Sequence, residues 1–132
     1  MAFDPTQKIL IVDDMSTMRK IIKNMLRKMG CNNIHEANDG IPAWELLVQA
    51  HEAKDPFQFI MSDWNMPGMT GLDFLIKVRA DERFKALPFL MVTAEGEQTN
   101  VITAVKAGVS NFVVKPFNII TLQEKIIKIF GK

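Results

Sequence analysis

The sequence predicts an α/β fold in which a doubly wound, five-stranded parallel sheet carries five helices on its two faces. Apolar runs and helical repeats alternate five times along the chain, which is the pattern of such sheets. The runs are continuous rather than alternating, as strands buried on both faces require. With 132 residues, 48% of them hydrophobic, the chain is long enough for one domain with a substantial core.

The first strand, the helix after it and the second strand follow from local patterns. Residues 8–12 are a β-branched run that stops at two aspartates, so we expect a strand there. Ser16 can cap the next helix and Gly30 can end it, with Arg19 among the basic residues on its exposed face. Residues 34–37 form a brief second strand. The predicted buried face of the helix consists of Ile21, Ile22, Met25, Leu26 and Met29.

The middle of the chain contains the stretch that organises the prediction. Pro42 suits the first turn of a second helix that runs to about residue 50. Residues 59–63 are an apolar run that ends in Asp63 and precedes a Met-Pro-Gly breaker, which fits a buried strand. A third helix follows Gly71.

The last third of the chain completes the alternation. We expect a fourth strand over 87–92, because Pro88 is tolerated at a strand's start, and a fifth over 111–114. Helices are expected over 98–107 and 119–130. Their predicted apolar faces are Val101, Ile102 and Val105 in the first, and Leu122, Ile126, Ile127 and Phe130 in the second.

Composition excludes several classes of protein. A formal net charge of +1 argues against a general nucleic-acid-binding surface. Cys31 is the single cysteine, so an internal disulfide is impossible and a reducing compartment fits. No stretch approaches the roughly 18 apolar residues of a membrane span, and the first seven residues lack the layout of a signal peptide. We therefore expect a cytoplasmic protein.

Polar residues stand where four of the predicted strands end. Asp13 and Asp14, Asp63, Thr93 and Lys115 follow or close the first, third, fourth and fifth strands, and parallel strands bring such ends to one edge. Three crowded carboxylates repel unless a cation lies among them, and Mg²⁺ prefers such oxygen ligands. A carboxylate beside Mg²⁺ and a lysine can attack phosphorus and form an aspartyl-phosphate.

Four segments carry a resemblance to a known family. Residues 12–19, 62–71, 91–95 and 113–117 resemble, in order, the motifs of response-regulator receiver domains, and within that family those of stand-alone chemotaxis regulators. The resemblance implies a flavodoxin-like receiver fold with strand order 2-1-3-4-5. It also implies that residues 1–132 form a single receiver domain with no output domain.

The resemblance assigns roles to individual residues. It implies Asp63 as the phospho-acceptor, Thr93 as a switch hydroxyl, and Lys115 as a phosphate clamp that precedes a cis bond to Pro116. The implied Mg²⁺ ligands are Asp13 (through water), Asp14, Asp63 and the backbone carbonyl of Asn65. The side chains of Asn65 and Glu95 would set the lifetime of the phosphoryl group.

One departure from the family concerns the switch position. Phe112 stands where a tyrosine is usual, and the chain has no tyrosine. Phe112 can still change rotamer, but it offers no hydroxyl to a partner. The tyrosine-specific hydrogen bond therefore does not transfer.

The expected function is a signalling switch rather than an enzyme, although it assists its own phosphorylation and dephosphorylation at Asp63. The resemblance implies a monomer that takes its phosphoryl group from a chemotaxis-type histidine kinase, binds the flagellar motor switch, and meets a phosphatase in some systems. The alternatives are a receiver in another phosphorelay, an aspartyl-nucleophile phosphatase, and a flavin protein. A phosphatase would need a second Asp two residues after its nucleophile, and a flavin protein a less acidic loop after the first strand.

Overall fold

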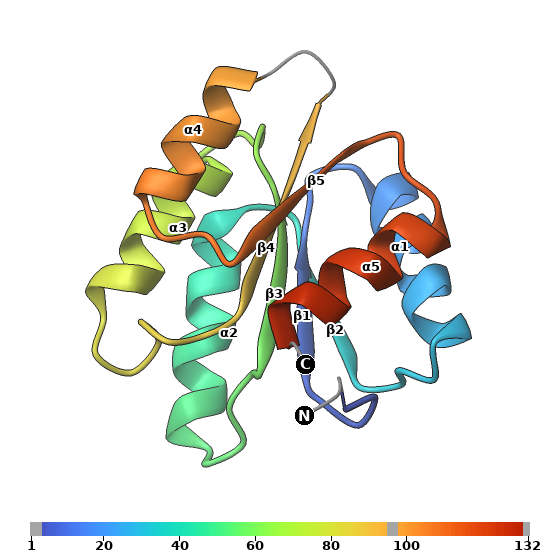
Figure 1. Ribbon diagram of the computed structural model, residues 1–132. Coiled ribbons are helices and arrows are strands. Elements are labelled where there is room, and N and C mark those ends of the chain that lie inside the picture. Colours follow the sequence, from blue (N-terminus) through green and yellow to red (C-terminus); the bar gives the residue numbers. More distant parts are fainter. Residues whose placement is uncertain (1–3, 95–97, 131–132) are drawn as a thin grey trace.

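The computed structural model describes residues 4–94 and 98–130, in which five strands and five helices alternate (Figure 1). None of the helices in these residues has the length and apolar character that crossing a membrane requires. The strands are β1 (Ile9–Val12), β2 (Ile34–Ala37), β3 (Phe59–Asp63), β4 (Phe89–Ala94) and β5 (Asn111–Lys115). The helices are α1 (Ser16–Lys28), α2 (Gly40–Glu52), α3 (Gly71–Ala80), α4 (Gln98–Lys106) and α5 (Ile119–Phe130).

The five strands are parallel and form one sheet in the order β2-β1-β3-β4-β5. This confirms the predicted doubly wound sheet and the implied strand order. β3 is central and buried along its whole length, which is why its sequence reads as a continuous apolar run. The register pairs Val12 with Ser62 and Asp63 with Val92, so the carboxyl ends of β1, β3 and β4 meet at one edge.

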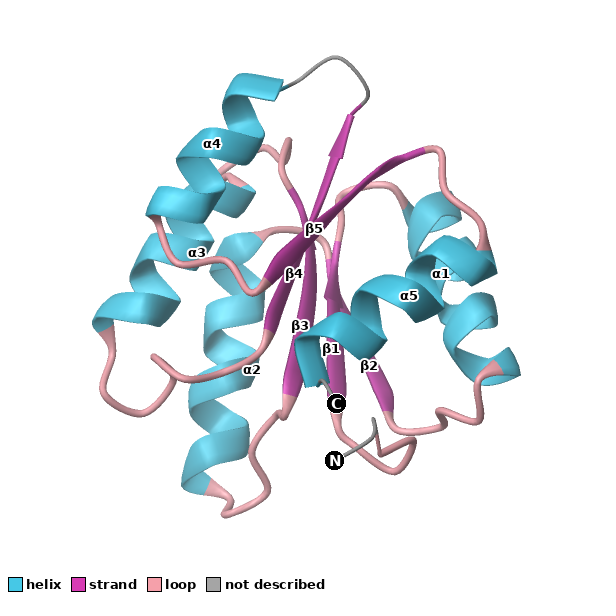
Figure 2. Ribbon diagram, viewed as in Figure 1, coloured by secondary structure: helices cyan, strands magenta, loops and turns pink. Residues whose placement is uncertain are grey.

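Helices cover both faces of the sheet (Figure 2). α1 and α5 lie on one face, and α2, α3 and α4 lie on the other. Because successive strand side chains point to opposite faces, β1 places Ile9 and Ile11 in one core and Leu10 and Val12 in the other. The sheet is therefore held between two apolar layers. This packing fixes the backbone that carries the polar residues at the edge of the sheet.

β4 begins and ends two residues later than the sequence predicts. The prediction was 87–92, whereas the strand is Phe89–Ala94. Pro88 has no N–H to add to the ladder, so the strand starts after it. At its other end β4 is longer because its last residue, Ala94, still pairs with Lys115 on β5. β5 also extends one residue beyond the prediction. Thr93 consequently lies inside a strand rather than after it.

The predicted start of α1 is also corrected. Ser16 was expected to be the cap, whereas Met15 occupies the N-cap position and makes no side-chain cap bond. The backbone N–H of Met15 instead donates to Asp13 Oδ1 at 2.9 Å, so the acidic residue before the helix fixes the turn. Gly30 ends the helix as predicted, with a φ of 94° that favours glycine.

Several apolar residues expected to be buried lie at the surface. Ile21 on α1 is 43% exposed and Ile127 on α5 is 62% exposed. On α4, Ile102 and Val105 are 59% and 61% exposed and Ala104 is buried, whereas the side chain of Val101 lies outside the described residues. Helical spacing identifies an apolar stripe, but packing against the sheet decides how much of it is covered. α4 therefore leaves an apolar surface open to solvent.

The two cores should dominate stability, and α3 offers a matched pair of residues to test this. Phe74 is fully buried between α3 and the sheet, whereas Ile76 is 50% exposed two residues away. We expect Phe74→Ala to lower the free energy of unfolding by about 3–5 kcal/mol because it leaves a cavity. Ile76→Ala should change it by about 0.5 kcal/mol or less. Urea unfolding measures both, and equal losses would contradict the layered packing.

Candidate functional site

Three aspartates meet at the carboxyl edge of the sheet. Asp13 and Asp14 follow β1, and Asp63 is the last residue of β3. One carboxylate oxygen from each lies within 4.8 Å of the others. Asp13 and Asp63 are 1% and 6% exposed, whereas Asp14 is open to solvent. The sheet register therefore produces the acidic cluster that the sequence predicted.

Lys115 completes the cluster from the end of β5. Its Nζ lies 3.0 Å from Asp63 Oδ1 and 3.7 Å from Asp13 Oδ2, so only the first contact is short enough for a hydrogen bond. The peptide bond between Lys115 and Pro116 is cis, as the resemblance implied. One ammonium thus faces two buried carboxylates.

The surroundings of the cluster disfavour the ionised form of its two buried carboxyl groups. Burial raises the pKa of Asp13, and the hydrogen bond from the Met15 backbone and the charge of Lys115 oppose this only in part. Burial also raises the pKa of Asp63, and the negative charge of Asp13 adds to the effect, while Lys115 opposes it. The metal-free cluster is therefore short of positive charge.

Three buried side-chain oxygens in the described residues have no hydrogen-bond partner: one belongs to Gln7, and the other two lie at this edge of the sheet. These two are Asp13 Oδ2 and Thr93 Oγ1, and both residues are nearly inaccessible to solvent. A buried unpaired polar atom is costly. The three carboxylates supply hard oxygen donors around one point. A divalent cation such as Mg²⁺ at that point would therefore be a suitable partner for Asp13 Oδ2. Thr93 Oγ1 is a hydroxyl oxygen at the same edge, free to bind a further group.

The backbone around Asp63 is held in place from several sides. Ser62 Oγ donates to the carbonyl of Asp63 at 3.1 Å. The next residue, Trp64, donates its N–H to Val92 and accepts one from Gly71, each at 2.9 Å. A Cβ at Gly71 would collide with the Asp63 carbonyl oxygen, so glycine is needed for this close approach.

The remaining predicted site residues are Asn65, Phe112 and Glu95. Asn65 is exposed two residues after the end of β3. Phe112 is half-buried on β5, with the Nζ of Lys125 4.7 Å from its ring centroid. Glu95 lies outside the described residues.

Sequence reasoning missed Arg19. We placed it on the solvent face of α1, yet its Nη1 donates to the backbone carbonyl of Asp13 at 2.6 Å and its Nε pairs with Glu36 at 3.0 Å. Both partners lie outside α1, on segments that helical periodicity does not describe. Only the packing of α1 against the sheet edge reveals the contact.

Known proteins are similar to this chain over nearly its whole length. The family model described as the response regulator receiver domain matches residues 9–127. The chemotaxis protein CheY of Pseudomonas aeruginosa is 57% identical over 125 residues, which cover 95% of this chain and 97% of that protein.

Solved structures agree with this likeness. The chemotaxis response regulator CheY4 of Vibrio cholerae is 34% identical, with a TM-score of 0.78 over 94% of this chain and 98% of that one. The receiver domain of a sensor histidine kinase from Pseudomonas aeruginosa, solved with a magnesium ion coordinated in its active-site cleft, is 26% identical. Its TM-score is 0.78 over 96% of this chain and 99% of that one.

The raised pKa of Asp63 predicts how stability depends on pH without a metal. The folded protein holds this proton more tightly than the unfolded chain does. The free energy of unfolding should therefore fall as the pH rises from the ordinary value of 3.8 through the folded pKa. In EDTA at neutral pH we expect Asp63→Asn to raise the free energy of unfolding by about 1–2 kcal/mol, the scale for an incompletely paired buried charge.

Urea unfolding at several pH values measures this effect. Glu45→Gln, which changes an exposed carboxylate on α2, is the control and should leave the pH dependence as in the parent protein. A loss of stability in Asp63→Asn at neutral pH would contradict the predicted charge balance.

Proposed function

Because this chain belongs to the response regulator receiver domain family, we propose that it is a phosphorylation-activated regulator of bacterial chemotaxis. The observation that carries the proposal is the geometry of Asp63. Its carboxylate lies 3.0 Å from Lys115 Nζ and beside those of Asp13 and Asp14. The chemotaxis assignment is supported by the relative named CheY at 57% identity. A receiver in another phosphorelay remains the alternative within the family, whereas family membership argues against a phosphatase or a flavin protein.

We propose that the acidic cluster binds Mg²⁺. Asp14 and Asp63 would supply carboxylate oxygens, the backbone carbonyl of Asn65 a further one, and Asp13 would act through water. The unpaired Asp13 Oδ2 and the shortage of positive charge support this assignment. When bound, the ion neutralises negative charge on a transferring phosphoryl group.

Asp63 is the proposed nucleophile. One of its carboxylate oxygens forms the bond to phosphorus while the bond from phosphorus to the donor breaks, and the donor is a chemotaxis-type histidine kinase. Lys115, which contacts Asp63 before transfer, would then hold a phosphoryl oxygen. In this proposal the protein assists its own phosphorylation and acts as a signalling switch, and Asn65 and Glu95 would set the lifetime of the product.

The switch is proposed to begin at Thr93. Its hydroxyl is buried at the site edge without a described partner, so it is available to donate to the phosphoryl group. Thr93 pairs with Val114 on β5, two residues after Phe112. A shift of β4 toward the phosphoryl group would therefore be transmitted to β5 and to the rotamer of Phe112.

The output surface is proposed to be formed by α4, β5 and α5. It exposes Ile102, Val105, Val114 and Ile120, and uncovered apolar side chains of this kind are typical of binding surfaces. Phosphorylation would bias this surface toward the conformation that binds the flagellar motor switch. We propose that the regulator acts as a monomer, with a dedicated phosphatase as a further partner.

Phosphoryl uptake tests the nucleophile. We expect Asp63→Asn to abolish acid-labile labelling from the kinase or from acetyl phosphate, because an amide oxygen does not form the acyl phosphate. Asp55→Asn, which changes an exposed carboxylate remote in the fold, should be labelled normally. Persistent labelling of Asp63→Asn would show that the acceptor is another residue.

Peptide binding tests the output surface. A peptide from the motor switch protein should bind more tightly after addition of a phosphoryl mimic, and Val105→Gln should weaken this binding by about tenfold through loss of apolar contact. Ile21→Gln changes a partly exposed apolar residue on α1, which lies on the other face of the sheet, and this variant should bind as the parent does. Fluorescence anisotropy measures the affinities. An affinity that the mimic does not change would disfavour the chemotaxis assignment.

A further inference from the structure

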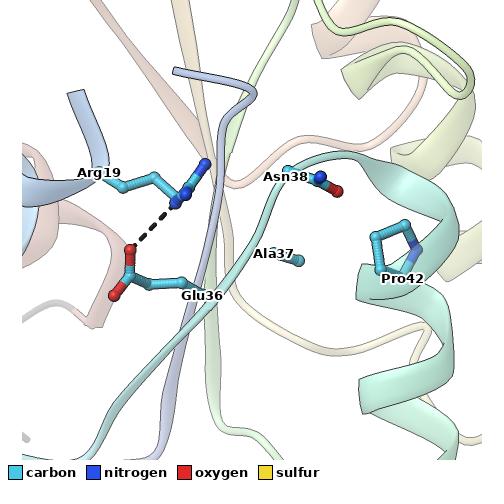
Figure 3. Close-up of a pocket in the computed structure, with 5 residues that line it drawn as sticks. All are labelled: Arg19, Glu36, Ala37, Asn38 and Pro42. Carbon is cyan, nitrogen blue, oxygen red and sulfur yellow. Dashed lines mark hydrogen bonds and ion pairs between the residues drawn. The ribbon is translucent and has the colours of Figure 1, made fainter. Parts of the chain in front are cut away.

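Arg19 connects the acidic cluster to the edge of the sheet. From α1 its Nη1 donates to the backbone carbonyl of Asp13 at 2.6 Å, while its Nε donates to Glu36 Oε1 on β2 at 3.0 Å. Figure 3 shows Arg19 and Glu36 facing each other at a pocket of about 300 Å³, with Asn38 on the adjoining loop. The Arg19 side chain is only 18% exposed. The guanidinium is thus part of the site's framework and not a freely moving surface group.

The anchor of this guanidinium is itself fixed. Glu36 on β2 pairs with Ile11 on β1. Ile11 stands two residues before Asp13 in the sequence. The other carboxylate oxygen of Glu36 accepts from Lys23 Nζ at 2.6 Å. The hydrogen bond from Lys23, followed by that from Arg19, lowers the pKa of Glu36 despite its partial burial. Arg19 is therefore held by an ionised group on the rigid part of the sheet.

The carbonyl that Arg19 contacts belongs to the peptide plane that joins Asp13 to Asp14. The N–H of Asp13 is bound by the carbonyl of Ala37 at 3.1 Å, which fixes the near side of Asp13. The bond from Arg19 fixes the plane after it. A hydrogen bond between a charged donor and a backbone carbonyl is stronger than a neutral one, so this plane resists rotation.

We propose that Arg19 is a positioning residue for the divalent cation, because it fixes the peptide plane between two acidic residues of the cluster. The inference rests on the proposed Mg²⁺ site and adds to it a residue whose hydrogen bond goes to the backbone carbonyl of Asp13 and not to a carboxylate of the cluster. Groups that orient ligands in this way affect metal affinity by about 10–100-fold elsewhere.

The competing explanation is that Arg19 acts only through its charge. The two explanations predict effects of opposite sign. Removing a positive charge near three carboxylates makes the local potential more negative, so charge alone predicts tighter Mg²⁺ binding. Loss of positioning predicts weaker binding. The sign of the change in affinity therefore separates them.

The experiment titrates MgCl₂ into the purified full chain and follows the fluorescence of Trp64, which adjoins Asp63. We expect Arg19→Met to weaken Mg²⁺ binding by about tenfold. Lys23→Met is the matched control: it removes a charge from the same helix and the same partner, Glu36, but leaves the contact to the Asp13 carbonyl. Its affinity should equal that of the parent or be slightly higher.

A second variant covers the possibility that Arg19→Met does not fold. Arg19→Lys keeps the charge but lacks the planar fork that reaches the Asp13 carbonyl and Glu36 together. We expect Arg19→Lys to weaken Mg²⁺ binding too, whereas the explanation by charge alone predicts no change in Mg²⁺ affinity. In the metal-free state the ¹³C resonance of the Asp13 carbonyl should shift in both Arg19 variants and stay in place in Lys23→Met.

The outcomes are distinct. Parent-like or tighter binding in the folded Arg19 variants, or an equal loss in Lys23→Met, would overturn the positioning role. If the parent protein itself shows no Mg²⁺ binding, the proposed metal site fails and not merely the role of Arg19.

Discussion

The structure depends on keeping buried carboxylates together at one edge of the sheet. Asp13 and Asp63 are both buried, and one ammonium, that of Lys115, lies within 3.7 Å of each carboxylate. Burial raises the pKa of both carboxyls, and the negative charge of Asp14 adds to this for Asp13 as that of Asp13 does for Asp63. The arrangement is therefore costly and persists only because the surrounding fold fixes it. A cluster short of positive charge fits a divalent cation, and this crowding of carboxylates is the feature on which the proposed phosphoryl transfer depends.

The packing of the sheet holds the buried carboxylates together despite their unfavourable surroundings. The inner strands β1, β3 and β4 are packed between two apolar layers, with α1 and α5 on one face of the sheet and α2, α3 and α4 on the other. The parallel ladder extends to the edge itself, where Trp64 still donates to Val92 and Ala94 still pairs with Lys115. Side chains at that edge are therefore carried on backbone that has little freedom to relieve their repulsion.

Helix α4 differs from the sheet edge because it leaves large apolar side chains exposed to solvent. It buries Ala104 and leaves Ile102 and Val105 exposed. An element of this kind can change its packing at low cost. Because β4 and β5 link the acidic edge to α4 and α5, a small change at Thr93 has a short path to the surface proposed to bind a partner.

The sequence by itself determined the alternation of strands and helices, the parallel sheet, and the set of residues at its carboxyl edge. Those features are predictable because buried strands and strand-end carboxylates leave local patterns. Only the tertiary structure decided that Thr93 lies within β4, that Met15 and not Ser16 is the N-cap of α1, that Ile127 faces solvent, and that Arg19 holds the Asp13 carbonyl. Each of these depends on which segment lies opposite, and a pattern within one segment carries no information about its neighbour across the fold.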